Sequence, residues 1–87
     1  MPNRPKRSES RYADEAGRLA EIIRRARQER RMSQQELATR AGISVGTVRA
    51  LESKRTVEPG YFTVQVLAEV LRISAAELPV ARPADEL

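Results

Sequence analysis

Residues 33–53 constrain the fold most, because their sequence, SQQELATRAGISVGTVRALES, predicts two short helices joined by a tight turn. Ser33 and Glu36 have the spacing of a capping box, in which each side chain bonds the other residue's backbone N–H. Gly42 stands where the first helix should end in a left-handed residue, and Ser44 can cap a second helix. We therefore expect two helices, over residues 34–40 and 45–53.

The second of these helices has one apolar side and one outward side. At about 100° per residue, Val48 and Leu51 point together toward a core. The residues on the opposite side are small or polar: Gly46, Arg49, Ala50 and Ser53. Two helices joined by a short turn that contains glycine form the helix-turn-helix unit.

Further helices are expected on both sides of this unit. The spacing of apolar residues predicts helices over residues 14–30 and 62–71, the second with Phe62 on its apolar side. Ser74 and Glu77 repeat the capping-box spacing, so a fifth helix should follow Ser74 and end at Leu78. At Arg31 the chain must either take a strained left-handed conformation or end the first helix in another way.

Length and composition limit what this chain can do. Its 87 residues suit a single domain, expected over residues 13–79, between a disordered basic arm (1–12) and a disordered tail (80–87). Aromatic residues are only 3% of the chain, so the core must be aliphatic. Cys and His are absent, which removes thiolate metal sites and the commonest general base. We therefore expect no enzyme activity, metal, cofactor or small-molecule ligand.

Positive charge is concentrated in the N-terminal part of the chain. Residues 1–31 contain ten Lys and Arg against five acidic residues, a balance of +5, whereas residues 59–87 contain two against four, a balance of −2. A basic segment beside an outward-facing helix favours a polyanion as partner. A solvated surface would have the same composition. No apolar run is long enough to span a membrane, so the expected location is cytoplasmic, at the nucleoid.

Residues 18–78 resemble the Cro/C1-type helix-turn-helix domain, also called the xenobiotic-response-element type. The resemblance is carried by Arg27 and by residues 33–38, 41–44, 51–52, 59 and 67–71. It implies an all-α fold, a compact five-helix bundle of the lambda-repressor-like DNA-binding type, with residues 45–53 in the major groove of double-stranded DNA. It also implies an ion pair between Arg27 and Glu52 and a phosphate contact by Gln34.

Side-chain chemistry suggests which residues of the second helix would contact bases. A guanidinium can bond guanine O6 and N7 together, so Arg49 is the best candidate for direct reading. Val45 and Thr47 can contact a thymine methyl group. Gly46 and Ala50 cannot hydrogen-bond through their side chains. Either the helix backbone approaches the groove closely there, or specificity depends on DNA shape.

Phosphate contacts are expected from the helix-turn-helix unit, the loop after it and the N-terminal arm. The candidates in the unit and the loop are Gln34, Gln35, Ser44, Ser53, Lys54 and Arg55. The candidates in the arm are Lys6, Arg7 and Arg11, although a terminus without contacts has the same composition. The arginine-rich outer side of the first helix is interpreted as solvated surface.

A single module of this kind buries only about 600–1,000 Å² of protein surface on DNA, so we expect a homodimer on a pseudo-palindromic operator. The expected dimer surface is the region of the fifth helix: Leu71, Ile73, Ala76, Leu78 and Val80. Packing within one chain explains Leu71, Ile73 and Leu78 equally well.

Two hypotheses of function follow. The first is a sequence-specific transcriptional regulator, most simply a repressor that blocks a promoter. The second is a protein-interaction module on the same fold, such as an antitoxin or the partner of another regulator. The few base-reading groups of the second helix and the acidic C-terminal third favour this second hypothesis.

Overall fold

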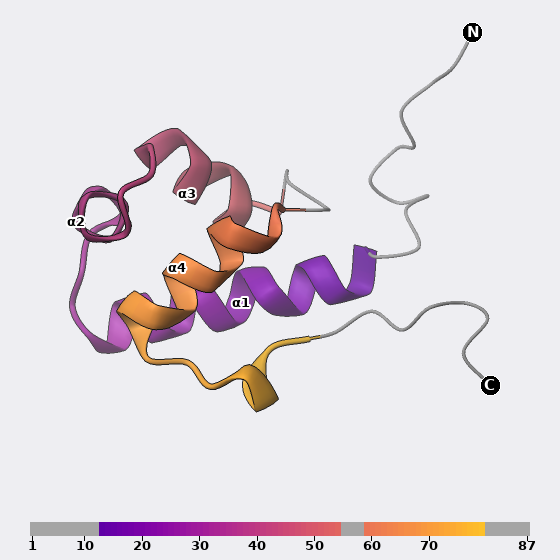
Figure 1. Cartoon of the computed structure of the whole chain (residues 1–87). Helices are drawn as coiled ribbons and strands as arrows, with labels where there is room; N and C mark the ends of the chain where they lie inside the picture. Colours follow the sequence, from indigo (N-terminus) through magenta and orange to yellow (C-terminus); the bar gives the residue numbers. More distant parts are fainter. Residues whose placement is uncertain (1–12, 55–58, 80–87) are drawn as a thin grey trace, which may run out of the picture.

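The computed structural model describes residues 13–54 and 59–79, and all regular structure in them is helical (Figure 1). The elements are α1 (Ala13–Glu29), α2 (Gln34–Ala41), α3 (Val45–Glu52), α4 (Tyr61–Leu71) and a 3₁₀ helix, η2 (Ala75–Glu77). The all-α class is confirmed, but the expectation of five α-helices is wrong. The described residues contain four, and the last segment forms a single 3₁₀ turn because Pro79 follows too soon for an α-helix to develop.

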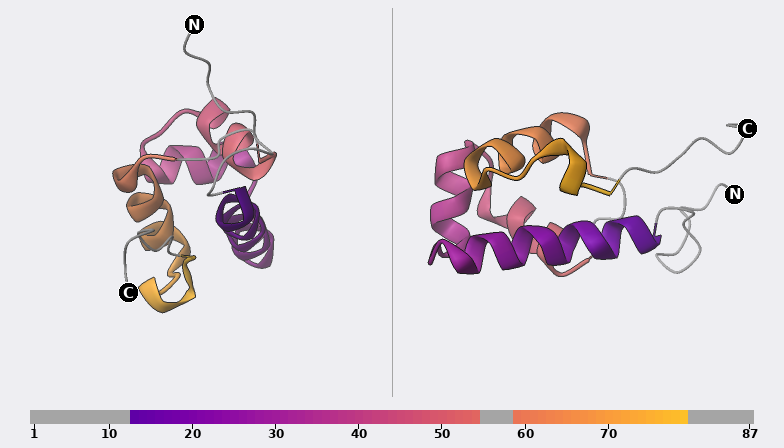
Figure 2. Two further views of the ribbon diagram at one scale, coloured as in Figure 1. Left: turned by 90° about the vertical axis from the view of Figure 1, so that its right-hand side faces the viewer. Right: turned by 90° about the horizontal axis from the view of Figure 1, so that it is seen from below.

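Helices α1 and α4 lie beside each other, and α2 and α3 lie across one end of this pair (Figures 1 and 2). Helix α1 packs against α3 and α4, and α4 packs against α1 and α2. Helix α3 also packs closely on α2, as expected for the helix-turn-helix unit. This arrangement leaves the outer side of α3 away from the other helices.

The core lies where these helices meet, and it is aliphatic as the composition requires. Its largest fully buried side chains are Ile23, Leu37, Val48, Leu67 and Leu71. Burial of a side chain of this kind contributes about 1.5–3 kcal/mol, so every α-helix is tied to the core through at least one large residue.

Helices α2 and α3 both begin at a bonded serine cap. Ser33 Oγ accepts the Glu36 N–H at 2.9 Å, and Ser44 Oγ accepts the Thr47 N–H at 3.1 Å. The Glu36 carboxylate bonds Arg40 at 2.9 Å, so only one half of the expected capping box is formed at Ser33. The cap alone is sufficient to orient the start of each helix.

Helices α1, α2 and α4 end in the same way, with a left-handed residue followed by an apolar one. The left-handed residues are Arg31 (φ 55°), Gly42 (φ 73°) and Arg72 (φ 57°). The next N–H donates to the carbonyl oxygen five residues before it, as Ile43 does to Ala38 at 3.0 Å. Gly42 takes this conformation without a Cβ clash, whereas it costs Arg31 and Arg72 about 1–2 kcal/mol each.

Helix α4 places its aromatic residues outward. Phe62 was expected on the apolar side of this helix, and this is wrong, because its side chain is 75% exposed and that of Tyr61 is 72% exposed. The two rings meet edge to face with centroids 5.2 Å apart. At about 100° per residue, Phe62 falls opposite the buried residues Leu67, Ala68 and Leu71. None of the described helices is both long and apolar enough to cross a membrane.

Candidate nucleic-acid interface

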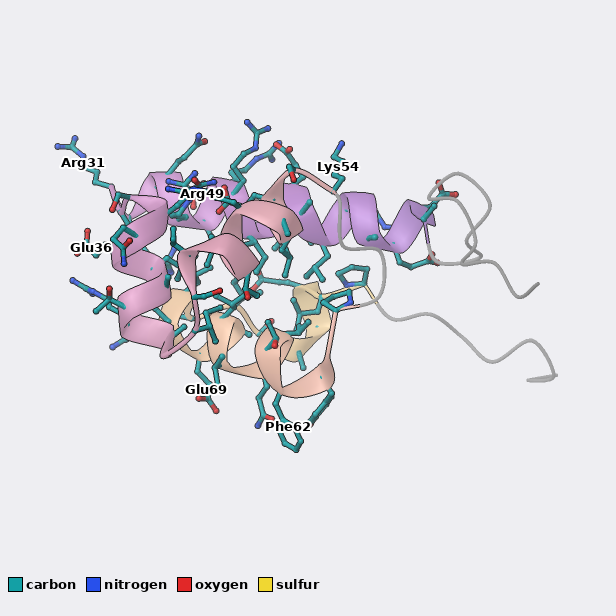
Figure 3. All side chains as sticks on the ribbon, turned by 90° about the horizontal axis from the view of Figure 1, so that it is seen from above. Arg31, Glu36, Arg49, Lys54, Phe62 and Glu69 are labelled. Carbon is teal, nitrogen blue, oxygen red and sulfur yellow. The ribbon has the colours of Figure 1, made fainter. Side chains whose placement is uncertain are left out.

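Helix α3 separates the side chains that anchor it from those that it presents. Val48, Leu51 and Glu52 are buried against the other helices. Gly46, Ala50 and Ser53 follow one another along the outer side at intervals of three or four residues, and they form a row of small side chains. The exposed side chains of Arg49 and Lys54 lie on the same side of the molecule, away from Phe62 and Glu69 (Figure 3).

Gly46 has no packing role inside the domain. A Cβ atom added at this residue would meet only Ser44 Oγ, at 3.8 Å, which is an ordinary contact. Its backbone is helical, so a side chain would be accommodated without strain. The fold therefore does not require glycine here, and the reason for it must be sought outside the domain.

A buried ion pair fixes α3 to α1, and it is the pair that the resemblance implies. The Arg27 guanidinium donates to both oxygens of the Glu52 carboxylate, at 2.7 and 2.9 Å, and the two side chains are only 12% and 3% exposed. Arg27 also donates to the carbonyl oxygen of Met32 at 2.7 Å. Gln34 Nε2, from α2, donates to Glu52 at 3.0 Å. One carboxylate thus connects three helices.

This network has a consequence for Gln34, which was expected to contact a phosphate. Its amide nitrogen is directed at Glu52, so the structure shows an orienting role for this side chain within the domain. Gln34 also lines an open hollow of about 400 Å³ between α1 and α3. The other residues that line the hollow are Arg24, Arg27, Arg49, Glu52 and Ser53.

Arg24 is a residue of this surface that the sequence analysis missed. The arginines of α1 were interpreted together as solvated surface, but Arg24 and Arg27 are three residues apart and therefore share one side of the helix. The signal was present in the sequence, because Arg27 was already expected to face Glu52. Arg24 Nη2 donates to Glu21 at 2.7 Å on the surface.

Arg24 and Glu21 each stabilise the charged form of the other. The hydrogen bond from Arg24 lowers the pKa of the Glu21 carboxyl, and a second, longer hydrogen bond from Arg25 acts in the same direction. The hydrogen bond to Glu21 in turn raises the pKa of Arg24. Glu21 is therefore ionised at neutral pH, and its pairing with the two arginines weakens only as the pH falls through its lowered pKa.

The remaining candidates for phosphate contacts lie at both ends of α3 and on α2. Ser44 Oγ lies 2.9 Å from Thr47 Oγ1, at the start of α3. Ser53 Oγ donates to the carbonyl oxygen of Ala50 at 3.2 Å. Lys54 is exposed and left-handed, with a φ of 67°. On α2, the exposed Gln35 donates to Thr39 at 3.2 Å. Arg55, Lys6, Arg7 and Arg11 lie outside the described residues.

The expected dimer surface needs correction. Leu71 is 0% and Ile73 is 8% exposed, so both belong to the core of their own chain and are not available to a partner. Ala76 is exposed and Leu78 is half-buried, while Val80 lies outside the described residues. Phe62 was expected on the apolar side of its helix and not on a surface for a partner.

Exposed apolar surface is found instead at the start of α4. Tyr61 and Phe62 are the exposed large hydrophobic side chains of the described residues. Tyr61 borders a groove of about 330 Å³ that is also lined by Val64, Ala68 and Leu78. We call this surface, formed by Tyr61, Phe62 and the groove, the aromatic patch.

Comparison with known proteins gives one family. A family model described as helix-turn-helix matches residues 23–78, which is more than half of the chain. The match begins at the middle of α1 and continues through η2, so it includes the ion pair, the α2–α3 unit and α4. The comparisons with curated proteins and with solved structures gave no match.

Proposed function

The chain belongs to the Cro/C1-type helix-turn-helix family, a family of DNA-binding regulatory domains, and from this premise we propose that it is a sequence-specific repressor of transcription. In this proposal it binds double-stranded DNA as a homodimer, with α3 in the major groove of each half-site. The observation that carries the proposal is the row of small residues on the outer side of α3, beside the exposed Arg49.

This row suits close contact with DNA. Because Gly46 and Ala50 have almost no side chain, the backbone of α3 can approach the edges of the base pairs. Arg49 then reads a guanine from the side of the helix that faces α1, and a bidentate contact of this kind discriminates against other bases by about 1–3 kcal/mol. Val45 and Thr47 contact thymine methyl groups.

Phosphate contacts position this helix. At the two ends of α3 they come from the hydroxyl groups of Ser44 and Ser53 and from Lys54. On α2, Gln35 and the exposed N–H groups at the helix start contact a second phosphate. Gln34 supports this contact by holding Glu52. Lys6, Arg7, Arg11 and Arg55 complete the proposed contact set.

A homodimer is needed because one module gives too little contact for a unique site. The aromatic patch supports a second copy as partner, since Tyr61 and Phe62 are the exposed large apolar residues described. A dimer that occupies a promoter excludes the polymerase, and repression is the simplest regulatory result of such binding.

A second function is also supported by the aromatic patch. If a different protein covers Tyr61 and Phe62, the chain would be an interaction module, such as an antitoxin or a partner of another regulator. The patch lies at the opposite edge of the molecule from Arg49, so such a partner would not have to compete with DNA (Figure 3).

Selection of bound duplexes from a random pool tests the proposal. We expect a palindromic consensus with half-sites about one helical turn apart, bound at least about 10³-fold more tightly than random DNA. Placed across a promoter, the selected site should lower transcription in vitro when the protein is added. Failure to enrich any sequence, together with binding that does not respond to salt, would favour the protein-interaction function.

A further inference from the structure

The open hollow between α1 and α3 has the charge of an anion site. Three of its lining residues are arginines, and Glu52 is the only carboxylate among them. Glu52 is already bonded twice by Arg27 and once by Gln34, at 2.7, 2.9 and 3.0 Å. Arg24 and Arg49 therefore bring two positive charges to the hollow that no carboxylate of its lining balances.

Arg24 can be released to a ligand at little cost. Its partner Glu21 is on the surface, and the side chains of the pair are 46% and 39% exposed. Exposed ion pairs of this kind contribute little to stability. Arginine binds phosphate through two parallel hydrogen bonds, which are stronger and geometrically better defined.

The other side of α1 provides an internal comparison. Arg25 bonds the same Glu21 carboxylate, at 3.4 Å, but it lines a different groove of about 390 Å³. That groove contains three glutamates (Glu21, Glu29 and Glu77) against two arginines (Arg18 and Arg25). Two neighbouring arginines with one shared partner thus face surfaces of opposite charge.

We propose that the hollow binds one phosphate of the DNA backbone and that Arg24 is its ligand from α1. The inference rests on the proposed function, because it takes a phosphodiester of the duplex as the anion. Arg24 exchanges Glu21 for the phosphate beside α1, while Lys54 contacts the backbone at the C-terminal end of α3. The recognition helix is then held between two phosphate contacts, and Arg49 is kept over its base pair.

The matched variants Arg24→Gln and Arg25→Gln test this contact. Each variant removes one positive charge and one hydrogen bond to Glu21. The two substituted residues therefore differ mainly in the surface that they face. On a random-sequence duplex of 30 base pairs, Arg24→Gln should weaken binding about tenfold and lower the slope of log K against log salt by about 1. Arg25→Gln should change the affinity less than about twofold. Equal effects of the two variants would overturn the proposal.

Two more variants separate the contact from folding and from the proposed function. Arg24→Lys should keep the salt slope, because a phosphate also accepts a lysine, and loss of the slope would contradict a charge contact. Glu21→Gln should strengthen binding by releasing Arg24, and weaker binding would contradict the exchange. Thermal unfolding of Arg24→Gln should match that of Arg25→Gln. If the unmodified protein fails to bind any duplex, the proposed function is wrong. If it binds but Arg24→Gln and Arg25→Gln weaken binding equally, only the phosphate contact of Arg24 is wrong.

Discussion

The helix-turn-helix unit (33–54) and the segment after it (59–79) are built by different means. Both helices of the unit start at a bonded serine cap, and α2 ends at a glycine in the left-handed conformation. Helix α4 starts after Gly60 without a side-chain cap bond and ends at Arg72, which takes the same conformation with a side chain.

This difference shows where the conformation is specified locally. In the unit, caps, turn residue and apolar spacing all favour the same structure, so the bounds of α2 and α3 depend little on distant contacts. In the later segment, buried Leu67, Leu71 and Ile73 hold a less favourable local conformation in place. Backbone strain alone does not separate the two segments, because each contains one non-glycine residue with a positive φ, Lys54 at 67° and Arg72 at 57°. The substitutions below test this contrast, in order of their expected effect on the free energy of unfolding.

The largest effect is expected at the ion pair that ties the unit to α1. Glu52→Ala leaves the buried Arg27 guanidinium without its carboxylate, which should cost about 3–5 kcal/mol in urea unfolding. The control is Glu36→Ala, which breaks the exposed pair with Arg40 and should cost less than about 1 kcal/mol. Similar losses in both variants would show that the Glu52 network does not anchor α3.

Substitutions at the left-handed ends of α2 and α4 should change the free energy of unfolding in opposite directions. Gly42→Ala places a Cβ in the left-handed conformation and should cost about 1–2 kcal/mol. Arg72→Gly removes that strain and should gain about 0.5 kcal/mol, since glycine also increases the entropy of the unfolded chain. Urea unfolding of both variants measures the difference. A stabilised Gly42→Ala variant would refute the idea that the left-handed conformation at residue 42 favours glycine.

Gly46→Ala should separate folding from binding. A helical glycine with open space around it costs about 1 kcal/mol against alanine, so the variant should be more stable by about that amount. Its affinity for the selected operator should nevertheless fall, because the added methyl group keeps α3 away from the base pairs. Unchanged affinity would instead favour recognition through DNA shape.

The smallest change in stability is expected at the aromatic patch. The double variant Tyr61→Ser, Phe62→Ser should keep the monomer's free energy of unfolding within about 0.5 kcal/mol, because both side chains are exposed. Light scattering should give the mass of a dimer for the unmodified protein and of a monomer for the variant, and the salt slope on the operator should be about halved. A variant that remains dimeric would place the interface elsewhere.

Local signals made most of the fold predictable. Ser33, Gly42 and Ser44 each act within their own turn, and the observed bounds of α2 and α3 differ from the expected ones by a single residue at one end. The sequence left open whether Arg31 takes the left-handed conformation or ends the first helix in another way. What decides it is the burial of the next residue, Met32, which is a tertiary contact.

The errors concern which side of an element is covered. Phe62 is apolar and at a helical position, so hydropathy placed it inward, but the direction of α4 is set by Leu67 and Leu71. Leu71 and Ile73 were assigned either to a dimer surface or to the core of their own chain, and their burial shows the core. Arg24 was missed because the arginines of α1 were interpreted together, although the expected Arg27–Glu52 pair already indicated which side of α1 lies beside α3.

The open surroundings of Gly46 bear on how such a protein could acquire a new target. Gly46 is exposed on the outer side of α3 with open space around it, while Val48, Leu51 and Glu52 attach the helix to the domain. The residue proposed to approach the bases is thus separate from the residues that hold the helix in place. Under the proposed function, a substitution at residue 46 should change the recognised operator while the protein stays folded.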